Sequence, residues 1–231
     1  MSRPPLLNPQ AVPALGFDSH LPAVEAARLR PDALRARLAA PPLWQPEFKG
    51  DGGSLDARPP ANAAVLIPLV MREEGVQVLL TRRTEHLRSH AGQISFPGGR
   101  MEPTDASPEA AALRETKEEI GLGADYIEVI GQLPIYATVT SFRVHPVVAL
   151  VRPGFELQLD AFEVAEAFEV PLSFLMTPAR HQRHRFVFDG GERHFYSMPW
   201  TPAGSQTEPS PYFIWGATAA ILRNFYRLLS A

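Results

Sequence analysis

The stretch SFPGGRMEPTDASPEAAALRETKEEIGL, residues 95–122, joins a glycine pair to an acidic segment and decides how the rest of the chain is interpreted. Ser107 is a suitable helix N-cap, and Pro108 then falls at the first helical position, where its missing N–H costs nothing. Gly121 directly follows the last apolar residue of the segment and is a suitable helix end. The stretch therefore predicts a loop followed by a helix that starts near Pro108 and stops at Gly121.

The predicted helix carries three glutamates, Glu115, Glu118 and Glu119, on an arc of roughly 100°, opposite the apolar positions Leu113 and Ile120. Like charges at these spacings repel each other, and in isolation the group is typical of a solvated helix face. The preceding glycines favour a different interpretation, because they allow backbone carbonyls to approach a ligand closely. Carboxylate and carbonyl oxygens are the ligands that Mg²⁺ and Mn²⁺ select, and such an ion would neutralise phosphate oxygens and activate a water.

The run from Gly99 to Leu122 resembles the signature box of the Nudix hydrolases, which ends Arg-Glu-(apolar)-x-Glu-Glu-x-Gly-(apolar). That ending is read here as RETKEEIGL, with Thr116 as a mild departure. The front of the box differs in spacing: Asp105 stands six residues after Gly99, but eight residues instead of seven separate it from Arg114. Three residues are therefore candidates for the first acidic position, namely Glu102, Asp105 and Glu109.

A second resemblance points to a substrate. The segment LLTRRTEHLRSHAGQISFPGG, residues 79–99, is similar to the additional motif of the coenzyme A pyrophosphatase branch of that family, with Thr84 where the branch has Ser or Ala. The positions that match the motif are Leu79, Leu80, Thr81, Arg83, Arg88, Gly92 and Phe96 to Gly99. The resemblance covers about residues 60–230. It implies hydrolysis of the diphosphate of coenzyme A, or of an acyl or oxidised derivative, to 4′-phosphopantetheine and adenosine 3′,5′-bisphosphate.

Two alternatives stay open beside this interpretation. One is a Nudix enzyme that acts on another nucleoside diphosphate derivative, such as ADP-ribose or a dinucleotide. The other is a non-catalytic nucleotide-binding module with the Nudix fold. The intact glutamates Glu115, Glu118 and Glu119 argue against the second alternative, because a binding module has no need of a metal helix.

The resemblance also implies roles for the acidic helix. Glu115 and Glu119 are the first choices as metal ligands, since they lie one turn apart on one helix face. Glu118 is the third ligand, and the Gly99 carbonyl completes the shell. Arg114 is expected to orient these carboxylates, with Glu118 or an upstream acid as its partner.

Further site residues are expected outside the helix. Arg82, Arg83 and Arg88 concentrate positive charge beside it and are predicted to bind the phosphates of the substrate. Nudix enzymes often draw another acid from a later segment, and in FEVAEAFEV, residues 162–170, the candidates are Glu163 and Glu166. We select Glu163 as the catalytic candidate.

The remaining pattern predicts an α/β protein. Strand-like runs at AAVLIPLV, GVQVLLTRR, YIEVIGQL, VHPVVALV, HRFVF and HFYSM precede a final helix, TAAILRNFYRLLS. We expect a Nudix fold over residues 61–231, a mixed β-sheet sandwiched between helices. Residues 1–60 are rich in Pro and are expected to form an N-terminal extension with an amphipathic helix near residues 30–40.

Composition limits the partners. The net charge of −3 gives no general attraction to nucleic acid or to an anionic membrane, and no apolar run approaches the length of a membrane span. The chain has no Cys and no secretory signal pattern, so we expect a cytoplasmic protein that acts on a small molecule. A homodimer is one assembly that the sequence leaves open.

Overall fold

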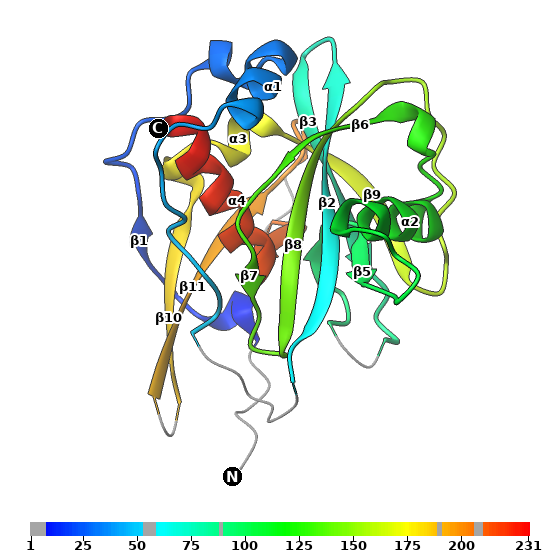
Figure 1. Ribbon diagram of the computed structural model, residues 1–231. Helices are drawn as coiled ribbons and strands as arrows, with labels where there is room; N and C mark the ends of the chain where they lie inside the picture. Colours follow the sequence, from blue (N-terminus) through cyan, green and yellow to red (C-terminus); the bar gives the residue numbers. More distant parts are fainter. Residues whose placement is uncertain (1–7, 53–58, 88–89, 189–190, 206–209) are drawn as a thin grey trace.

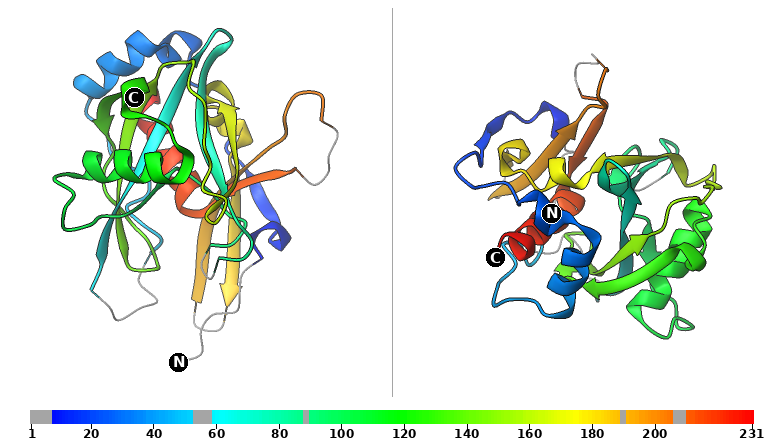
Figure 2. Two further views of the ribbon diagram at one scale, coloured as in Figure 1. Left: turned by 90° about the vertical axis from the view of Figure 1, so that its right-hand side faces the viewer. Right: turned by 90° about the horizontal axis from the view of Figure 1, so that it is seen from above.

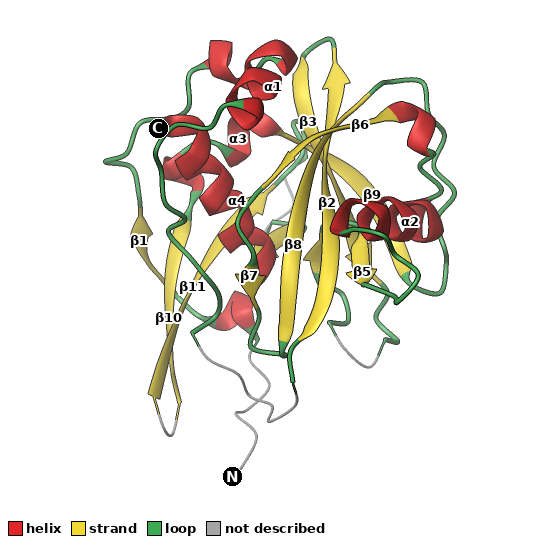
Figure 3. Cartoon of the chain, viewed as in Figure 1, coloured by secondary structure: helices red, strands yellow, loops and turns green. Residues whose placement is uncertain are grey.

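The computed structural model describes residues 8–52, 59–87, 90–188, 191–205 and 210–231 (Figures 1 and 3). Its elements, in chain order, are η1 Pro9–Ala11, β1 Ala14–Phe17, η2 Ala26–Leu29, α1 Pro31–Ala39, β2 Ala61–Arg72, β3 Gly75–Arg83, β4 Ile94–Ser95, β5 Gly98–Arg100, α2 Pro108–Ile120, η3 Ala124–Tyr126, β6 Ile127–Gln132, β7 Tyr136–Ala137, β8 Phe142–Val151, β9 Val164–Pro171, α3 Leu172–Leu175, η4 Pro178–Arg180, β10 Gln182–Phe188, β11 Gly191–Trp200, β12 Tyr212–Trp215 and α4 Gly216–Ser230. Among the described residues, no helix is long and apolar enough to cross a membrane.

A mixed sheet of eight strands forms the centre of the protein. Five strands follow the order β4-β3-β2-β8-β6, while β5, β7 and β9 pair with β2, β8 and β3. Strands β2 and β8 run parallel to each other, and the other pairs in this sheet are antiparallel. The predicted mixed sheet is confirmed.

Helices cover both faces of this sheet because its strands are apolar on both sides. On β2, Ala64 and Leu66 pack against α2, whereas Ile67 and Leu69 belong to the larger core that includes Phe225 of α4. The view from above shows α2 in green on one side of the sheet and α4 in red on the other (Figure 2). The expected layering of helix, sheet and helix is therefore confirmed.

The sheet is split between β2 and β3, and this split positions the glycine-rich segment. The two strands pair only near their hairpin, where Leu69 lies opposite Val78 and Arg72 opposite Gly75. Beyond that point β2 pairs with β5 and β3 pairs with β4. The run 95–100 thus enters the sheet from its open end, and β5 within it lies next to α2.

The runs HRFVF and HFYSM are strands, as expected, but they do not join the mixed sheet. They lie in β10 and β11 of a separate antiparallel sheet with the order β1-β10-β11-β12. Strand β11 packs against α4 (Figure 1). The short connection between β10 and β11 makes them pair with each other, and β1 from the N-terminal region takes the free edge of β10.

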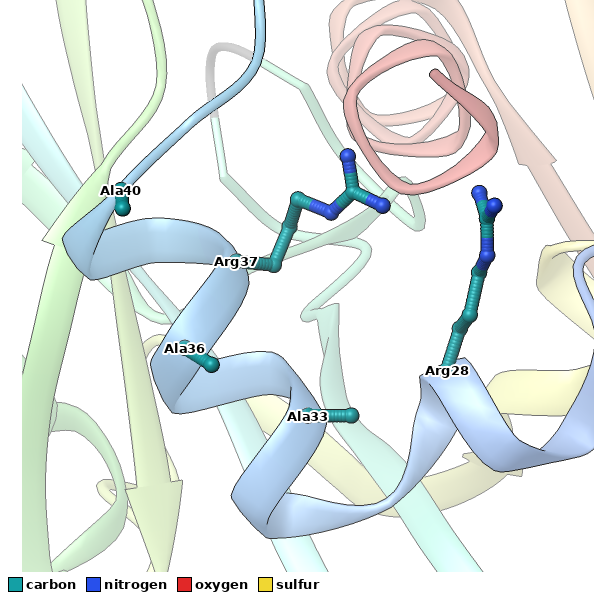
Figure 4. Close-up of a pocket in the computed structure, with 5 residues that line it drawn as sticks. All are labelled: Arg28, Ala33, Ala36, Arg37 and Ala40. Carbon is teal, nitrogen blue, oxygen red and sulfur yellow. The ribbon is translucent and has the colours of Figure 1, made fainter.

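The N-terminal region packs onto the body of the protein through α1. Leu34 of this helix is fully buried in the larger core, and Arg35 binds both carboxylate oxygens of Glu128 on β6 at 2.8 Å. Arg28 and Arg37 line a pocket between α1 and the end of α4, where they donate hydrogen bonds to main-chain oxygens of Leu229 and Ala231 (Figure 4). These cations lie where the carbonyl groups of a helix terminus are negative.

A buried ionic network connects this N-terminal region with α4. The Arg223 guanidinium is almost fully buried and contacts Asp18 at 2.9 Å and Glu47 at 2.8 Å. Its Nη1 also lies 3.1 Å from Nδ1 of His181, whose Nε2 lies 2.8 Å from the Leu175 carbonyl oxygen. Because the carbonyl can only accept, the Nε2 of His181 carries the proton and its Nδ1 accepts from Arg223.

The His181 imidazole should make the stability of the protein sensitive to acid. Burial, aided by the Arg223 charge, lowers its pKa to about 4. As the pH falls below the ordinary value of 6.5, the unfolded chain binds a proton that the folded protein does not, so stability is lost between pH 6.5 and 4. By pH 5 we expect a loss of about 2 kcal/mol in the free energy of unfolding from this group.

His181→Gln keeps a donor and an acceptor at this position. Urea unfolding at pH 7.5 and pH 5 should show that the variant loses less free energy of unfolding on acidification than the wild type. Equal losses in both proteins would contradict the assignment.

Candidate active site

Helix α2 carries four of the candidate residues, Arg114, Glu115, Glu118 and Glu119, and its ends are those that the sequence predicts. The Ser107 hydroxyl accepts a hydrogen bond from the Ala110 amide at 3.2 Å, Pro108 opens the helix, and Gly121 ends it in the left-handed conformation with φ of 71°. These features fix the start and the end of the helix, and hence which side chains face the sheet.

The three glutamates of α2 do not form a solvated helix face, the interpretation that their spacing suggests in isolation. Glu118 is exposed and Glu115 is partly buried, but Glu119 is only 5% exposed. The cause is the split in the sheet, because β5 lies against the carboxylate side of α2 and supplies a second wall there.

The glycine pair makes this close approach possible. The Gly98 amide donates a hydrogen bond of 3.0 Å to Oε2 of Glu119. A Cβ at Gly98 would lie 2.4 Å from the Ala64 carbonyl oxygen, and a Cβ at Gly99 would lie 2.5 Å from a carboxylate oxygen of Glu115. Neither position can therefore accept a side chain without a shift of its neighbours. Sequence reasoning considered the Gly99 carbonyl and missed the Gly98 amide, for which the glycine pair was the signal.

Arg83 connects the helix with the residue that precedes β9. Its Nη1 lies 3.5 Å from a Glu119 oxygen and its Nη2 lies 3.4 Å from a Glu163 oxygen. The Nε of Arg83 is buried and has no hydrogen-bond partner. Of the two acids proposed from the segment after residue 161, Glu163 thus faces the glutamates of α2.

Arg82 and Glu166 lie on the opposite face of the sheet from Arg83 and Glu163. The Arg82 guanidinium packs over the Tyr212 ring at 5.0 Å, donates to the Pro211 carbonyl at 2.8 Å and lies 3.4 Å from Glu166. Successive side chains of a strand alternate between faces, so two adjacent arginines on β3 cannot both reach α2. Arg88, the third predicted phosphate-binding residue, lies outside the described residues.

Arg114 holds the remaining acids in place. Its Nε and Nη2 bind both oxygens of Asp105 at 3.0 and 2.9 Å, while its Nη1 binds Glu115 at 3.0 Å and Glu118 at 2.9 Å. The two-point contact with Asp105 fixes the plane of the guanidinium and therefore the direction in which it holds the two glutamates.

The structure distinguishes the three candidates for the first acidic position of the box. Asp105 is the acid that contacts Arg114, and its Oδ2 also accepts from the Glu102 amide at 2.7 Å. The Glu109 carboxylate instead accepts a hydrogen bond from Gln132 on β6. Only Asp105 of the three therefore joins the arginine and glutamate cluster in the described part of the chain.

Burial and crowding shift the protonation of this cluster. Burial raises the pKa of Glu119 to about 7 and also raises that of Glu115, and the nearby Glu163 carboxylate adds to both effects. In contrast, the hydrogen bonds from Arg114 lower the pKa of Asp105. The site thus holds more negative charge than its two arginines compensate.

The donor set is suited to a hard divalent cation, although no three acidic or histidine side chains in the described segments form a ready metal-binding group. Glu119 and Glu115 instead form ion pairs with Arg83 and Arg114, respectively. Glu115 and Glu119 supply oxygen ligands on consecutive turns, and the bare backbone of Gly99 lies against the Glu115 carboxylate. These residues could hold the cation that compensates the excess charge.

The chain is similar to known proteins over much of its length. The NUDIX domain family matches residues 60–189. A protein called uncharacterized Nudix hydrolase NudL, from Enterobacter sp. (strain 638), is 42% identical over 70% of this chain and 79% of its own length. Its namesake from Citrobacter koseri is 40% identical over 78% of this chain and 86% of its own length. The crystal structure of a MutT protein from Methanosarcina mazei Go1 covers 52% of this chain and 83% of its own, with 25% identity and a TM-score of 0.40. The chain belongs to the Nudix hydrolase family.

Proposed function

We propose that this Nudix hydrolase cleaves the diphosphate bond of coenzyme A, or of an acyl or oxidised derivative. One observation carries the proposal. The segment that resembles the coenzyme A pyrophosphatase motif, residues 79–99, reaches the same glutamate from both of its ends, through Arg83 and through the Gly98 amide. Contact between the segment that indicates the substrate and a candidate metal ligand supports the proposal.

We assign Mg²⁺ or Mn²⁺ to Glu115 and Glu119, with the Gly99 carbonyl and the more exposed Glu118 as further ligands. The all-oxygen donor set and the raised pKa of Glu119 support this assignment, since an uncompensated buried carboxylate favours a cation beside it. When bound, the ion supplies charge neutralisation at the phosphate oxygens and a more acidic water.

The protein's own side chains position the diphosphate and handle the proton. Arg83 has a buried Nε without a partner and lies between Glu119 and Glu163, so it is placed to bind a phosphate oxygen. Glu163 is 43% exposed at its side chain and is our candidate for the base that accepts a proton from the attacking water. Arg114 acts through Glu115 and Glu118, which it holds in orientation.

The substrate assignment predicts a specific order of rates. Incubation of the purified protein with coenzyme A, ADP-ribose and a nucleoside triphosphate, with Mg²⁺ or Mn²⁺, should show the highest kcat/KM for coenzyme A. The products should be 4′-phosphopantetheine and adenosine 3′,5′-bisphosphate, separated by chromatography, and chelator should abolish their formation. Much faster cleavage of ADP-ribose would reject the substrate, and no cleavage under any metal condition would favour the non-catalytic alternative.

The Glu119 assignment predicts a change in stability that is independent of turnover. Its folded-state pKa of about 7 exceeds the ordinary value of 4.5, so its contribution to stability is present below pH 4.5 and is lost as the pH rises through 7. The loss is about 3 kcal/mol in metal-free protein. In chelator at pH 8, Glu119→Gln should therefore be more stable than the wild type, although inactive.

A divalent cation should reverse that order. Added Mg²⁺ should raise the Tm of the wild type at pH 8 and raise that of Glu119→Gln much less. The exposed Glu118→Gln variant is the control, since in chelator it should follow the pH dependence of the wild type. If neither Mg²⁺ nor Mn²⁺ changes the Tm of the wild type, the assignment of Glu119 as a metal ligand is wrong.

The contacts of Arg114 predict which acid fills the first position of the box. Asp105→Asn removes the charged partner that orients Arg114, and we expect activity to fall by about 10- to 100-fold. Glu109→Gln is the matched control, because Glu109 contacts Gln132 on the far side of the helix, and it should retain nearly full activity. If Glu109→Gln were the more damaging change, the assignment of Asp105 would be wrong.

A further inference from the structure

An exposed aromatic side chain is adjacent in sequence to a residue of the candidate active site. Phe162, the residue before Glu163, is 65% exposed. Its ring contacts the exposed His86 imidazole, with ring centroids 4.9 Å apart and planes inclined at 57°. Single exposed hydrophobic residues are common on protein surfaces, so the exposure alone means little. The position of this ring, and the way in which it is held, carry the inference.

The loop that carries Phe162 is attached to the C-terminal end of α2. The Gln158 amide donates to the Ile120 carbonyl and the Asp160 amide donates to the Glu119 carbonyl, both at 2.9 Å. The Asp160 side chain then accepts from the Phe162 amide at 2.9 Å. These bonds fix the main chain of Phe162 relative to the helix turn that carries Glu119.

A second attachment joins Phe162 to Thr84, the residue after β3. The Thr84 hydroxyl donates to the Phe162 carbonyl at 2.7 Å, and the Thr84 amide donates to the Glu163 carbonyl at 2.9 Å. Thr84 directly follows Arg83 and lies two residues before His86, whose ring contacts that of Phe162. An exposed ring on a loop held at both ends is preorganised, and it loses little conformational freedom when a ligand covers it.

We propose that Phe162, together with His86, forms a stacking platform for the purine base of the substrate. The inference rests on the proposed function, in which the diphosphate is bound between Arg83 and the glutamates of α2. A planar base stacks well on an aromatic face, and stacking buries apolar surface that Phe162 now exposes. The platform would therefore contribute to affinity for the nucleotide half of the substrate and not for its pantetheine half.

Equilibrium binding of the two separate product halves tests this inference without turnover. The probes are adenosine 3′,5′-bisphosphate and 4′-phosphopantetheine, titrated by calorimetry into wild type, Phe162→Leu and His86→Ala in the presence of Mg²⁺. We expect Phe162→Leu to weaken binding of adenosine 3′,5′-bisphosphate by about 5- to 50-fold, and His86→Ala to weaken it less. Binding of 4′-phosphopantetheine should be unchanged in both variants.

Two further variants control for general effects. Val187→Ala changes a side chain with the same exposed fraction, 65%, on β10 and should leave both dissociation constants as they are. Phe162→Trp should retain nucleotide binding, and the new indole should be quenched by the bound base. The platform is rejected if Phe162→Leu binds adenosine 3′,5′-bisphosphate as tightly as the wild type, or if it loses affinity for both halves equally.

The outcome can be separated from that of the proposed function. Adenosine 5′-monophosphate is a third probe, because it carries the base without the 3′-phosphate of coenzyme A. If coenzyme A is not cleaved but binding of adenosine 5′-monophosphate still depends on Phe162, the coenzyme A assignment fails and the platform is supported. If coenzyme A is cleaved and no adenine nucleotide depends on Phe162, the platform fails alone.

Discussion

The hydrogen bond from the Gly98 amide to the Glu119 carboxylate is the contact on which the candidate site depends, because it joins the split sheet to the acidic helix. It forms only where β2 and β3 separate and where Gly98 can lie against β2 without a side chain. The same approach encloses Glu119, and this burial raises the pKa of its carboxyl, although the Gly98 hydrogen bond itself lowers it. The close packing at Gly98 therefore links the sheet topology to the acidity of the site.

The two arginines of the site differ in how closely they contact the carboxylates. Arg114 has short contacts with Asp105, Glu115 and Glu118, all between 2.9 and 3.0 Å. Arg83 has longer contacts of 3.4 and 3.5 Å and keeps one buried donor without a partner. Charge-assisted hydrogen bonds weaken with distance, so Arg83 can exchange its partners for a phosphate at lower cost than Arg114 can.

Much of the fold could be predicted from local patterns, whereas the site required the topology. Ser107, Pro108 and Gly121 fix α2 because capping is a property of neighbouring residues. The burial of Glu119 depends on β5. A helical projection considers only the residues of α2, so it gives no information about that strand. The choice among three acids for the partner of Arg114 likewise depends on how the loop before α2 folds. Strand periodicity places Arg82 and Arg83 on opposite faces of the sheet. The prediction of the phosphate-binding residues grouped both arginines by their charge and did not use this periodicity.

The Arg223 network connects residues that lie outside the region covered by the family match. Asp18 and Glu47 precede residue 60, and Arg223 follows residue 189, yet the guanidinium is 1% exposed and uses both carboxylates as counter-charges. A chain shortened to residues 60–189 would lose α4 and its share of the larger core, and one that lacked only the first sixty residues would leave a buried cation uncompensated. The network therefore joins residues that precede and follow the family match into one buried ionic cluster.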